Sequence, residues 1–282
     1  MNTFKAEVNK IILALTSVGI VILLMLPASL SASHFRYETM SWSLDNATTI
    51  RLKLDAGYSY ASGDFRGTVG ATVTSSGWMT IDWGDGNSET ATLRTTSIDT
   101  VAGSSITEIG DNSTGTWVPG VTHTYADNGT YIVVWKKNAR IANIKNIPSS
   151  GSKWWRAETK VTIGGDNNTS PVSAVPPIVQ VQDNKTFTYQ VSATDANSDN
   201  LTYRWGTKAE FFGSSGAFVM PTGMTLSDSG LIEWDVRDSV LCSGCSQNDL
   251  NDVGDLWVSV IMVEDRHDNG SAKSYIPIDF FF

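Results

Sequence analysis

Apolar and polar residues alternate one by one along much of this chain, which is the period of a β-strand and not that of a helix. In residues 186–193, Phe187, Tyr189 and Val191 fall on one face of the strand, and mainly polar residues fall on the other. Residues 49–54 repeat the pattern. Because each such strand has one apolar face, we expect antiparallel sheets with one face buried. The pattern predicts an all-β fold.

Two runs, residues 131–135 and 256–263, are apolar on both faces. Runs of this length predict central strands that are covered from both sides. Between the strands lie clusters of Gly, Asn, Asp and Ser. These residues supply turns, because they tolerate a positive φ or bond to their own backbone.

One internal segment, residues 164–177, shows no periodicity and concentrates Gly, Asn and Pro. We expect it to be an interdomain linker that is semi-rigid at its proline end. The remaining sequence then divides into a first domain at residues 33–163 and a second at residues 178–282. Each has the size of one immunoglobulin-like β-sandwich, so the sequence predicts two tandem sandwiches.

The first 32 residues have the pattern of a secretory signal peptide. Lys5 and Lys10 precede an apolar run at residues 11–26, and small residues follow with cleavage predicted after Ser31 or Ala32. The alternative is an uncleaved membrane anchor, since the run approaches the roughly 20 residues that cross a bilayer. No later segment is apolar enough to span, so we expect the rest to be secreted or held at the cell surface.

The chain is acidic, with a formal net charge of −9. Cleavage after residue 32 would remove two lysines and one glutamate, which leaves a charge near −10. A negative surface argues against nucleic acid and anionic membranes as partners and is compatible with divalent cations.

The two cysteines, Cys242 and Cys245, stand in a Cys-Ser-Gly-Cys sequence among turn residues. In an exported chain we expect them to form a local disulfide. A redox-active pair is the alternative, although such motifs usually open a helix in a βαβ unit. A zinc site would need two more ligands at a suitable spacing, which the neighbouring sequence does not offer.

A turn motif marks the first predicted domain. Residues 82–86 read Asp-Trp-Gly-Asp-Gly after an apolar strand, and residues 123–131 return with His-Thr-Tyr and Gly-Thr-Tyr. Together they resemble the PKD-type domain, an immunoglobulin-like β-sandwich of extracellular proteins. The resemblance implies that the aspartates and glycines shape a tight connection across which the tyrosine strand packs. The separation is longer than usual in that family, so we expect residues 95–119 to form an inserted loop or hairpin.

The second predicted domain resembles bacterial cadherin-like and putative-immunoglobulin repeats, through residues 191–203, 221–234 and 260–265. Residues 33–42 are similar to the mature start of exported bacterial proteins, in which they form the first strand. Both resemblances imply a surface protein.

An acidic turn in the second domain is the candidate metal site. Asp195, Asn197 and Asp199 alternate with small residues, and Asp265 and Asp268 could face the same end of the sandwich. Ca²⁺ suits such a set because it accepts six to eight oxygen ligands in flexible geometry. The alternative is an Asx-rich hairpin whose side chains bond only to the backbone.

Aromatic and basic residues meet at Trp154, Trp155 and Arg156. Exposed tryptophans could stack on sugar rings while the arginine donates hydrogen bonds, which would make a glycan-binding site. The alternative places one Trp in the core and the other partly covered on the same strand. At the end of the sequence, Pro277 suggests an edge strand that could complete a neighbour's sheet.

No Gly-x-Ser-x-Gly elbow, His-Glu-x-x-His helix or phosphate-binding glycine loop occurs, and there are only three histidines. We therefore expect a protein that is not an enzyme. The leading hypothesis is an adhesion or structural protein of the cell surface or extracellular matrix, with Ca²⁺ as a stabilising ion. Its partners would be other surface proteins, glycans or further copies of itself. The alternatives are a carbohydrate-binding protein and a filament subunit joined by strand exchange.

Overall fold

The computed structural model describes residues 35–73, 80–101, 103–138, 140–165, 167–175, 178–182, 185–212, 218–236 and 256–282. The predicted signal peptide and both cysteines lie outside these ranges. Within them, no helix is both long and apolar enough to span a membrane.

Strands make up almost all of the regular structure, so the all-β prediction is confirmed. The strands are β1 (Phe35–Leu44), β2 (Thr49–Ser59), β3 (Thr72–Val73), β4 (Thr80–Asp82), β5 (Ser88–Thr90), β6 (Thr92–Asp99), β7 (Ser104–Asp111), β8 (Val118–Pro119), β9 (Val121–Thr124), β10 (Gly129–Asn138), β11 (Trp154–Ile163), β12 (Thr186–Gln190), β13 (Asn200–Trp205), β14 (Thr225–Leu226), β15 (Leu231–Asp235), β16 (Val258–Arg266) and β17 (Ala272–Phe281). The helical pieces are η1 (Gly63–Phe65), η2 (Ser150–Ser152) and α2 (Lys208–Phe212).

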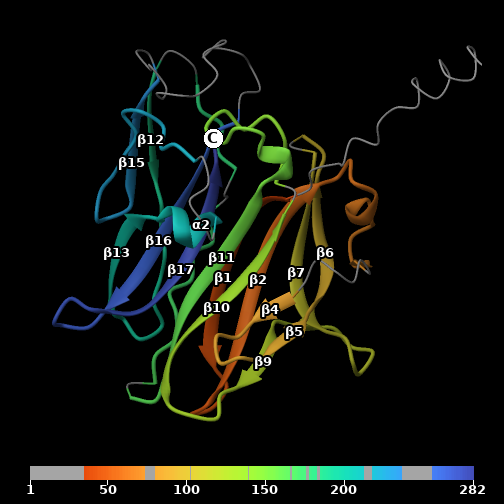
Figure 1. The fold of residues 1–282 in the computed structure, drawn as a ribbon, viewed down its shortest axis with the longest axis vertical. Coiled ribbons are helices and arrows are strands. Elements are labelled where there is room, and N and C mark those ends of the chain that lie inside the picture. Colours follow the sequence, from red (N-terminus) through yellow and green to blue (C-terminus); the bar gives the residue numbers. More distant parts are fainter. Residues whose placement is uncertain are drawn as a thin grey trace, which may run out of the picture. The chain divides into compact units, whose positions relative to one another are not determined.

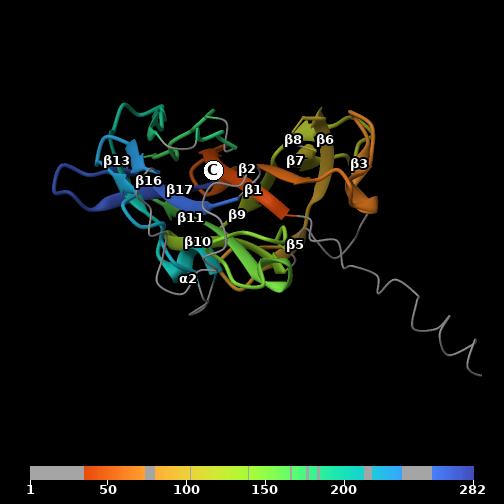
Figure 2. The ribbon, with the colours of Figure 1, turned by 90° about the horizontal axis from the view of Figure 1, so that it is seen from above.

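The strands form one large antiparallel sheet and one small one (Figure 1). The large sheet runs β3-β6-β7-β2-β1-β17-β11-β10-β4-β5, with β13 joined through β16 to β17. The small sheet runs β12-β15-β14. Figure 2 shows that β1 and β2 lie in one layer and β10 and β11 in another, with β17 beside both. Of the two alternatives for the insertion, the structure has the hairpin: β6 pairs with β7, which extends the sheet beyond β2.

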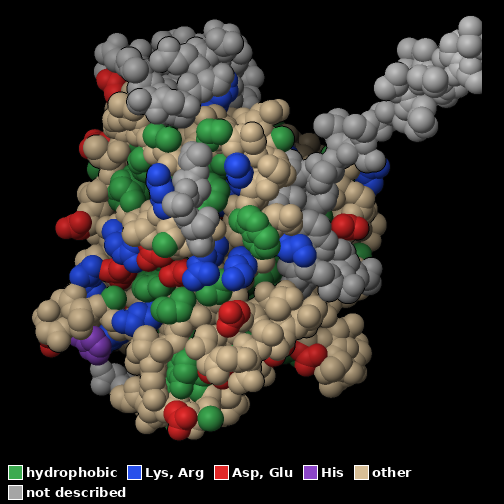
Figure 3. Space-filling view, in the orientation of Figure 1, with side chains coloured by type: hydrophobic (Ala, Val, Ile, Leu, Met, Phe, Trp, Pro, Cys, Tyr) green, Lys and Arg blue, Asp and Glu red, His purple; other side chains and the backbone are tan. Residues whose placement is uncertain are grey.

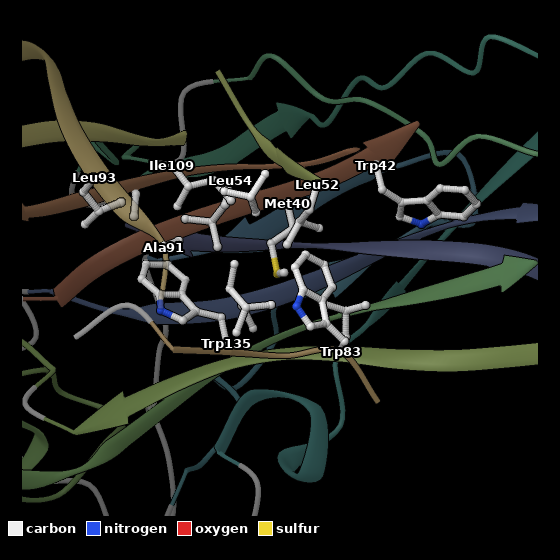
Figure 4. Packing of buried hydrophobic residues seen from close by; sticks show 14 of the residues in the cluster. Met40, Trp42, Leu52, Leu54, Trp83, Ala91, Leu93, Ile109 and Trp135 are labelled. Carbon is white, nitrogen blue, oxygen red and sulfur yellow. The ribbon is translucent and has the colours of Figure 1, made fainter. Parts of the chain in front are cut away.

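The first hydrophobic core fills the space between these two layers. Four buried tryptophans, Trp42, Trp83, Trp135 and Trp155, belong to it. In Figure 4, Trp83 and Trp135 lie opposite Met40, Leu52 and Leu54 from β1 and β2. The alternation that predicts β2 places Ile50, Leu52 and Leu54 in this core.

A second core lies between the small sheet and strands β13, β16 and β17. A third cluster covers the opposite face of β16 and β17, where Tyr37 and Ile144 pack with Phe211 and Val258. Burial of β16 on both faces agrees with its doubly apolar sequence. The predicted linker at 164–177 therefore separates the first core from the second, whereas the large sheet and the third cluster include residues from both sides of it. The described residues all belong to one compact unit.

The final strand is internal, so the edge-strand prediction from Pro277 is wrong. Strand β16 pairs with β17 along its length, and the other edge contacts β1 at Ile278 and β11 at Tyr275. Pro277 lies between these two contacts, where β17 changes partners. A residue without an N–H is tolerated there because that edge forms no continuous ladder.

The Asp-Trp-Gly-Asp-Gly turn is held by its own side chains. Asp82 Oδ1 accepts the N–H of Gly84 at 3.0 Å, and Asp85 Oδ1 accepts the N–H of Asn87 at 2.9 Å. Gly84 has a φ of +78°, and a Cβ there would lie 2.6 Å from the carbonyl oxygen of Ile132. Only glycine fits this position.

The returning strand packs on this turn through His123. Its ring stacks on Trp83 at a centroid distance of 4.6 Å, and its Nε2 lies 2.8 Å from Asp85 Oδ2. Burial acts to raise the pKa of the Asp85 carboxyl, but the hydrogen bonds to His123 and Asn87 outweigh it and lower the pKa to about 2. Asp85 thus serves to fix the turn.

Candidate functional site

The acidic turn between β12 and β13 folds around Asp195. Its Oδ1 accepts the backbone N–H groups of Asn197 at 2.8 Å and Asp199 at 3.0 Å, while Ser198 takes a left-handed φ of +64°. These bonds make an Asx turn, as the alternative to a metal site expects. They account for only one carboxylate oxygen, however. Oδ2 of Asp195 and Oδ2 of Asp199 are both buried and accept no hydrogen bond from the residues that the structure describes.

Asp265 approaches the turn from the end of β16, near the hairpin into β17 (Figure 1). It is fully buried. Its Oδ1 accepts both the N–H and the hydroxyl of Ser274, each at 2.6 Å. Its Oδ2 accepts the amide N–H of Asn168 at 2.6 Å. A buried carboxylate needs several such donors to stay charged.

These three aspartates meet in space. One oxygen from each of Asp195, Asp199 and Asp265 lies within 4.8 Å of the others, a separation that a single metal ion can bridge. The structure thus brings together three of the five residues that the sequence suggested as metal ligands.

The other two residues lie differently. Asn197 Oδ1 accepts the N–H and the hydroxyl of Thr169, so its side chain holds the linker segment. Asp268 is exposed in the turn between β16 and β17 and does not belong to the carboxylate group.

Asn168 is a member of the site that the sequence did not single out. It is buried, and while its Nδ2 donates to Asp265, its Oδ1 has no hydrogen-bond partner among the described residues. Asn168 lies in the predicted linker, one of two adjacent asparagines in a run of turn residues. No local pattern distinguishes it from its neighbour Asn167, because its role depends on contacts far along the chain.

A lysine from β17 completes the surroundings. Lys273 Nζ lies 2.6 Å from Asp199 Oδ1, and both side chains are largely buried. The site therefore holds three carboxylates, one ammonium and one amide.

Adjacent residues of β11 point to opposite faces of the sheet, so Trp154 and Trp155 of the aromatic candidate site lie on different faces. Trp155 is fully buried and stacks on Phe35 at 4.0 Å, whereas Trp154 is 53% exposed. Arg156 Nε donates to Glu158 at 2.7 Å. The three residues therefore do not form one surface, and a sugar could stack only on Trp154.

One face of the molecule carries charges of both signs side by side. Figure 3 shows a band in which Lys and Arg side chains lie next to Asp and Glu side chains. Among the ion pairs, Arg204 contacts Glu210 of α2 and Glu264 of β16. Such a mixed band lacks the excess of one sign that attracts a polyanion.

Comparison with known proteins shows which proteins the chain resembles. Residues 36–164 match the family model described as "Integrin beta-like protein A-E, N-terminal". This part of the chain is similar to integrin beta-like proteins. The match covers nearly the same residues as the predicted first domain and the first hydrophobic core.

Curated relatives come from Dictyostelium discoideum. Integrin beta-like protein B is 30% identical over 208 residues, protein C 29% over 215 and protein A 28% over 222. The alignments cover 69%, 71% and 70% of this chain but only 9%, 10% and 10% of the relatives. The chain thus spans about a tenth of the length of the curated relatives that it matches.

These relatives are not the exported bacterial proteins to which the resemblances pointed. The PKD-type and cadherin-like identities of the two halves therefore stay predictions. Among solved structures, the two tandem V-type regions of VCBP3, a v-region-containing chitin binding protein, align with a TM-score of 0.37 and 11% sequence identity. That alignment covers 87% of this chain and 99% of the other.

Proposed function

We propose that this chain is a non-enzymatic, exported protein that acts in adhesion or as a structural element of the cell surface or extracellular matrix. The observation that carries this proposal is the similarity of residues 36–164 to the N-terminal part of integrin beta-like proteins. The strand-built fold offers a scaffold for contact with other surface proteins, with glycans or with further copies of the chain.

Adhesion can be measured directly. Beads coated with the full chain are expected to attach to cells of the source organism, or to one another, more in millimolar calcium than in chelator. Beads coated with an inert protein are the control. Attachment no greater than that control in either solution would contradict the proposed function.

Calcium binding at the acidic site is the second part of the proposal. Oxygens of Asn168, Asp195 and Asp199 are buried beside the carboxylate of Asp265 and have no hydrogen-bond partner among the described residues. Such atoms usually cost about 1–3 kcal/mol each unless a partner satisfies them. Carboxylate and amide oxygens are the ligands that Ca²⁺ prefers, and these residues fit that set.

The amide of Asn168 offers a further ligand by a simple movement. The two amide atoms are nearly equivalent in shape, so rotation of the group by half a turn would exchange Nδ2 for Oδ1 beside Asp265. Two acceptor oxygens facing each other repel, unless a cation lies between them. Calcium would then connect the linker segment with the turn after β12 and the end of β16.

We expect calcium to stabilise the fold. With the ion at about ten times its Kd, linkage gives roughly 1.4 kcal/mol, which for a chain of this size raises Tm by about 3–6 °C. Thermal unfolding of the full chain in chelator and in millimolar calcium measures the shift. Asp195→Asn should abolish it.

Asp268→Asn is the matched control, because it removes an aspartate that lies outside the carboxylate group. Its calcium shift should equal that of the unmodified chain. Equal Tm values in chelator and calcium for the unmodified chain would remove calcium from the proposal, and loss of the shift in Asp268→Asn would place the ion elsewhere.

A further inference from the structure

Lys273 places a largely buried ammonium group beside the acidic site. It follows the start of β17, and its Nζ reaches Asp199 Oδ1 at 2.6 Å. Only 15% of its side chain is exposed, and 16% of that of Asp199. The backbone carbonyl of Lys273 accepts the hydroxyl of Thr162 at 2.9 Å, which fixes the strand from which the side chain extends.

The three neighbouring carboxylates explain the electrostatic role of the Lys273 ammonium. Three carboxylates within 4.8 Å repel one another strongly when all are ionised. The donors around Asp195 are neutral backbone N–H groups, and those on Asp265 come from Ser274 and Asn168. Lys273 is thus the cation that the structure places directly on one of the three carboxylates.

We propose that Lys273 is an internal counter-ion that competes with calcium for Asp199. This inference rests on the proposed calcium site and adds how that site is tuned. When calcium is bound, a lysine ammonium and a divalent cation would lie on the same carboxylate, and their repulsion weakens binding. When calcium is absent, the ammonium offsets part of the repulsion between the carboxylates, and the fold persists.

The consequence is a site of low affinity. Calcium sites in proteins range from nanomolar to millimolar Kd according to the charge of the ligand set and its rigidity. Three carboxylates opposed by one ammonium carry the net charge of a weaker set. We therefore expect the affinity to lie in the range of about 10⁻⁴–10⁻³ M that is typical of extracellular modules.

Calorimetric titration of the full chain with calcium tests the inference. Even at the dielectric constant of water, a +2 and a +1 charge about 5 Å apart repel enough to change a binding constant by roughly tenfold. Lys273→Gln is therefore expected to bind calcium at least about tenfold more tightly than the unmodified chain. In chelator the same variant should have a lower Tm, and calcium should restore it.

Lys160→Gln provides the matched control. Lys160 lies on the neighbouring strand β11, and its Nζ donates to the backbone carbonyl of Ala272. Its removal takes the same formal charge from this part of the molecule. Its effect on the calcium affinity should stay below about threefold.

The outcomes separate this inference from the proposed site. If neither the unmodified chain nor Lys273→Gln binds calcium, the proposed site itself fails. If the unmodified chain binds and Lys273→Gln binds equally or more weakly, the site stands and the counter-ion role is overturned. Equal gains in Lys273→Gln and Lys160→Gln would also overturn it, since the effect would then be one of overall charge.

A second variant covers the case in which Lys273→Gln does not fold. Lys273→Arg keeps the positive charge and can bind Asp199 through two parallel hydrogen bonds. It should fold in chelator and bind calcium at least about threefold more weakly. An affinity that is unchanged or higher in this variant would contradict the inference.

Discussion

Replacement of Arg140 by methionine is expected to lower the free energy of unfolding by about 3–5 kcal/mol at pH 7, one of the largest effects of any single substitution in this chain. Arg140 and Asp279 are fully buried, and their side chains form a two-point ion pair that includes Nη1 to Oδ1 at 3.2 Å. The guanidinium also lies over the rings of Phe35 and Phe211, at 5.1 and 4.9 Å. Loss of the arginine would leave a buried carboxylate without its cation.

The pH dependence of the stability loss tests whether the unpaired Asp279 carboxylate causes it. Burial raises the pKa of Asp279, and Arg140 opposes the rise, so the pKa should move higher still in Arg140→Met. A raised carboxyl pKa in the folded state favours folding at pH values below the unfolded pKa, and this contribution is lost as pH rises. The deficit of the variant should therefore be smaller at pH 5 than at pH 7.

Urea unfolding of the full chain at both pH values measures the effect. The double variant Arg140→Met with Asp279→Leu is the control, because it removes the Asp279 carboxylate together with its cation and should recover much of the loss. An equal deficit in the single and double variants would mean that packing, and not the buried charge, is responsible.

Replacement of Trp155 by alanine is expected to cost about 3–5 kcal/mol, whereas the same change at its neighbour Trp154 should stay within about 0.5 kcal/mol. Trp155 is fully buried, stacked on Phe35 and in edge contact with Trp135 at 4.6 Å. Trp154 is 53% exposed on the opposite face of β11. The two variants remove the same side chain from adjacent positions, so each is the control for the other.

Denaturant unfolding of both variants gives the comparison. Similar losses at the two positions would show that Trp154 has packing that its exposure does not reveal. The pair also bears on the glycan alternative. Loss of glycan binding on Trp154→Ala, without loss of stability, would support a sugar-binding role for that residue alone.

The strands were predictable wherever one face of the sheet meets solvent. In β12 the alternation of Phe187 and Tyr189 with polar residues sets the orientation, because a slip of one residue would expose both rings. The burial of β16 on both faces also follows from its sequence. The place of β17 does not, since Pro277 forbids a continuous ladder but says nothing about which strands meet on either side of it.

The three aspartates of the acidic site were predictable from the sequence, but its other members were not. Asp195 and Asp199 lie in one turn, so their spacing in the sequence already brings them together. Asp265 could be added because strands of one sandwich end at a common edge. Asn168 and Lys273 belong to segments whose sequences carry no metal-ligand pattern, and only the register of β16 with β17 and the path of the linker place them there.

The position of β17 has a consequence for how the protein is made. Thr39 of β1 pairs with Ile278, near opposite ends of the described chain. A ribosome adds about 5–20 residues per second, so the edge of β1 waits for roughly ten seconds or more before its partner emerges. During that time the nascent first sandwich presents an unpaired strand edge, which is a template for association with other chains. The large sheet is thus complete only after β17 has been made, and the yield of folded protein should depend on how well that open edge is shielded until then.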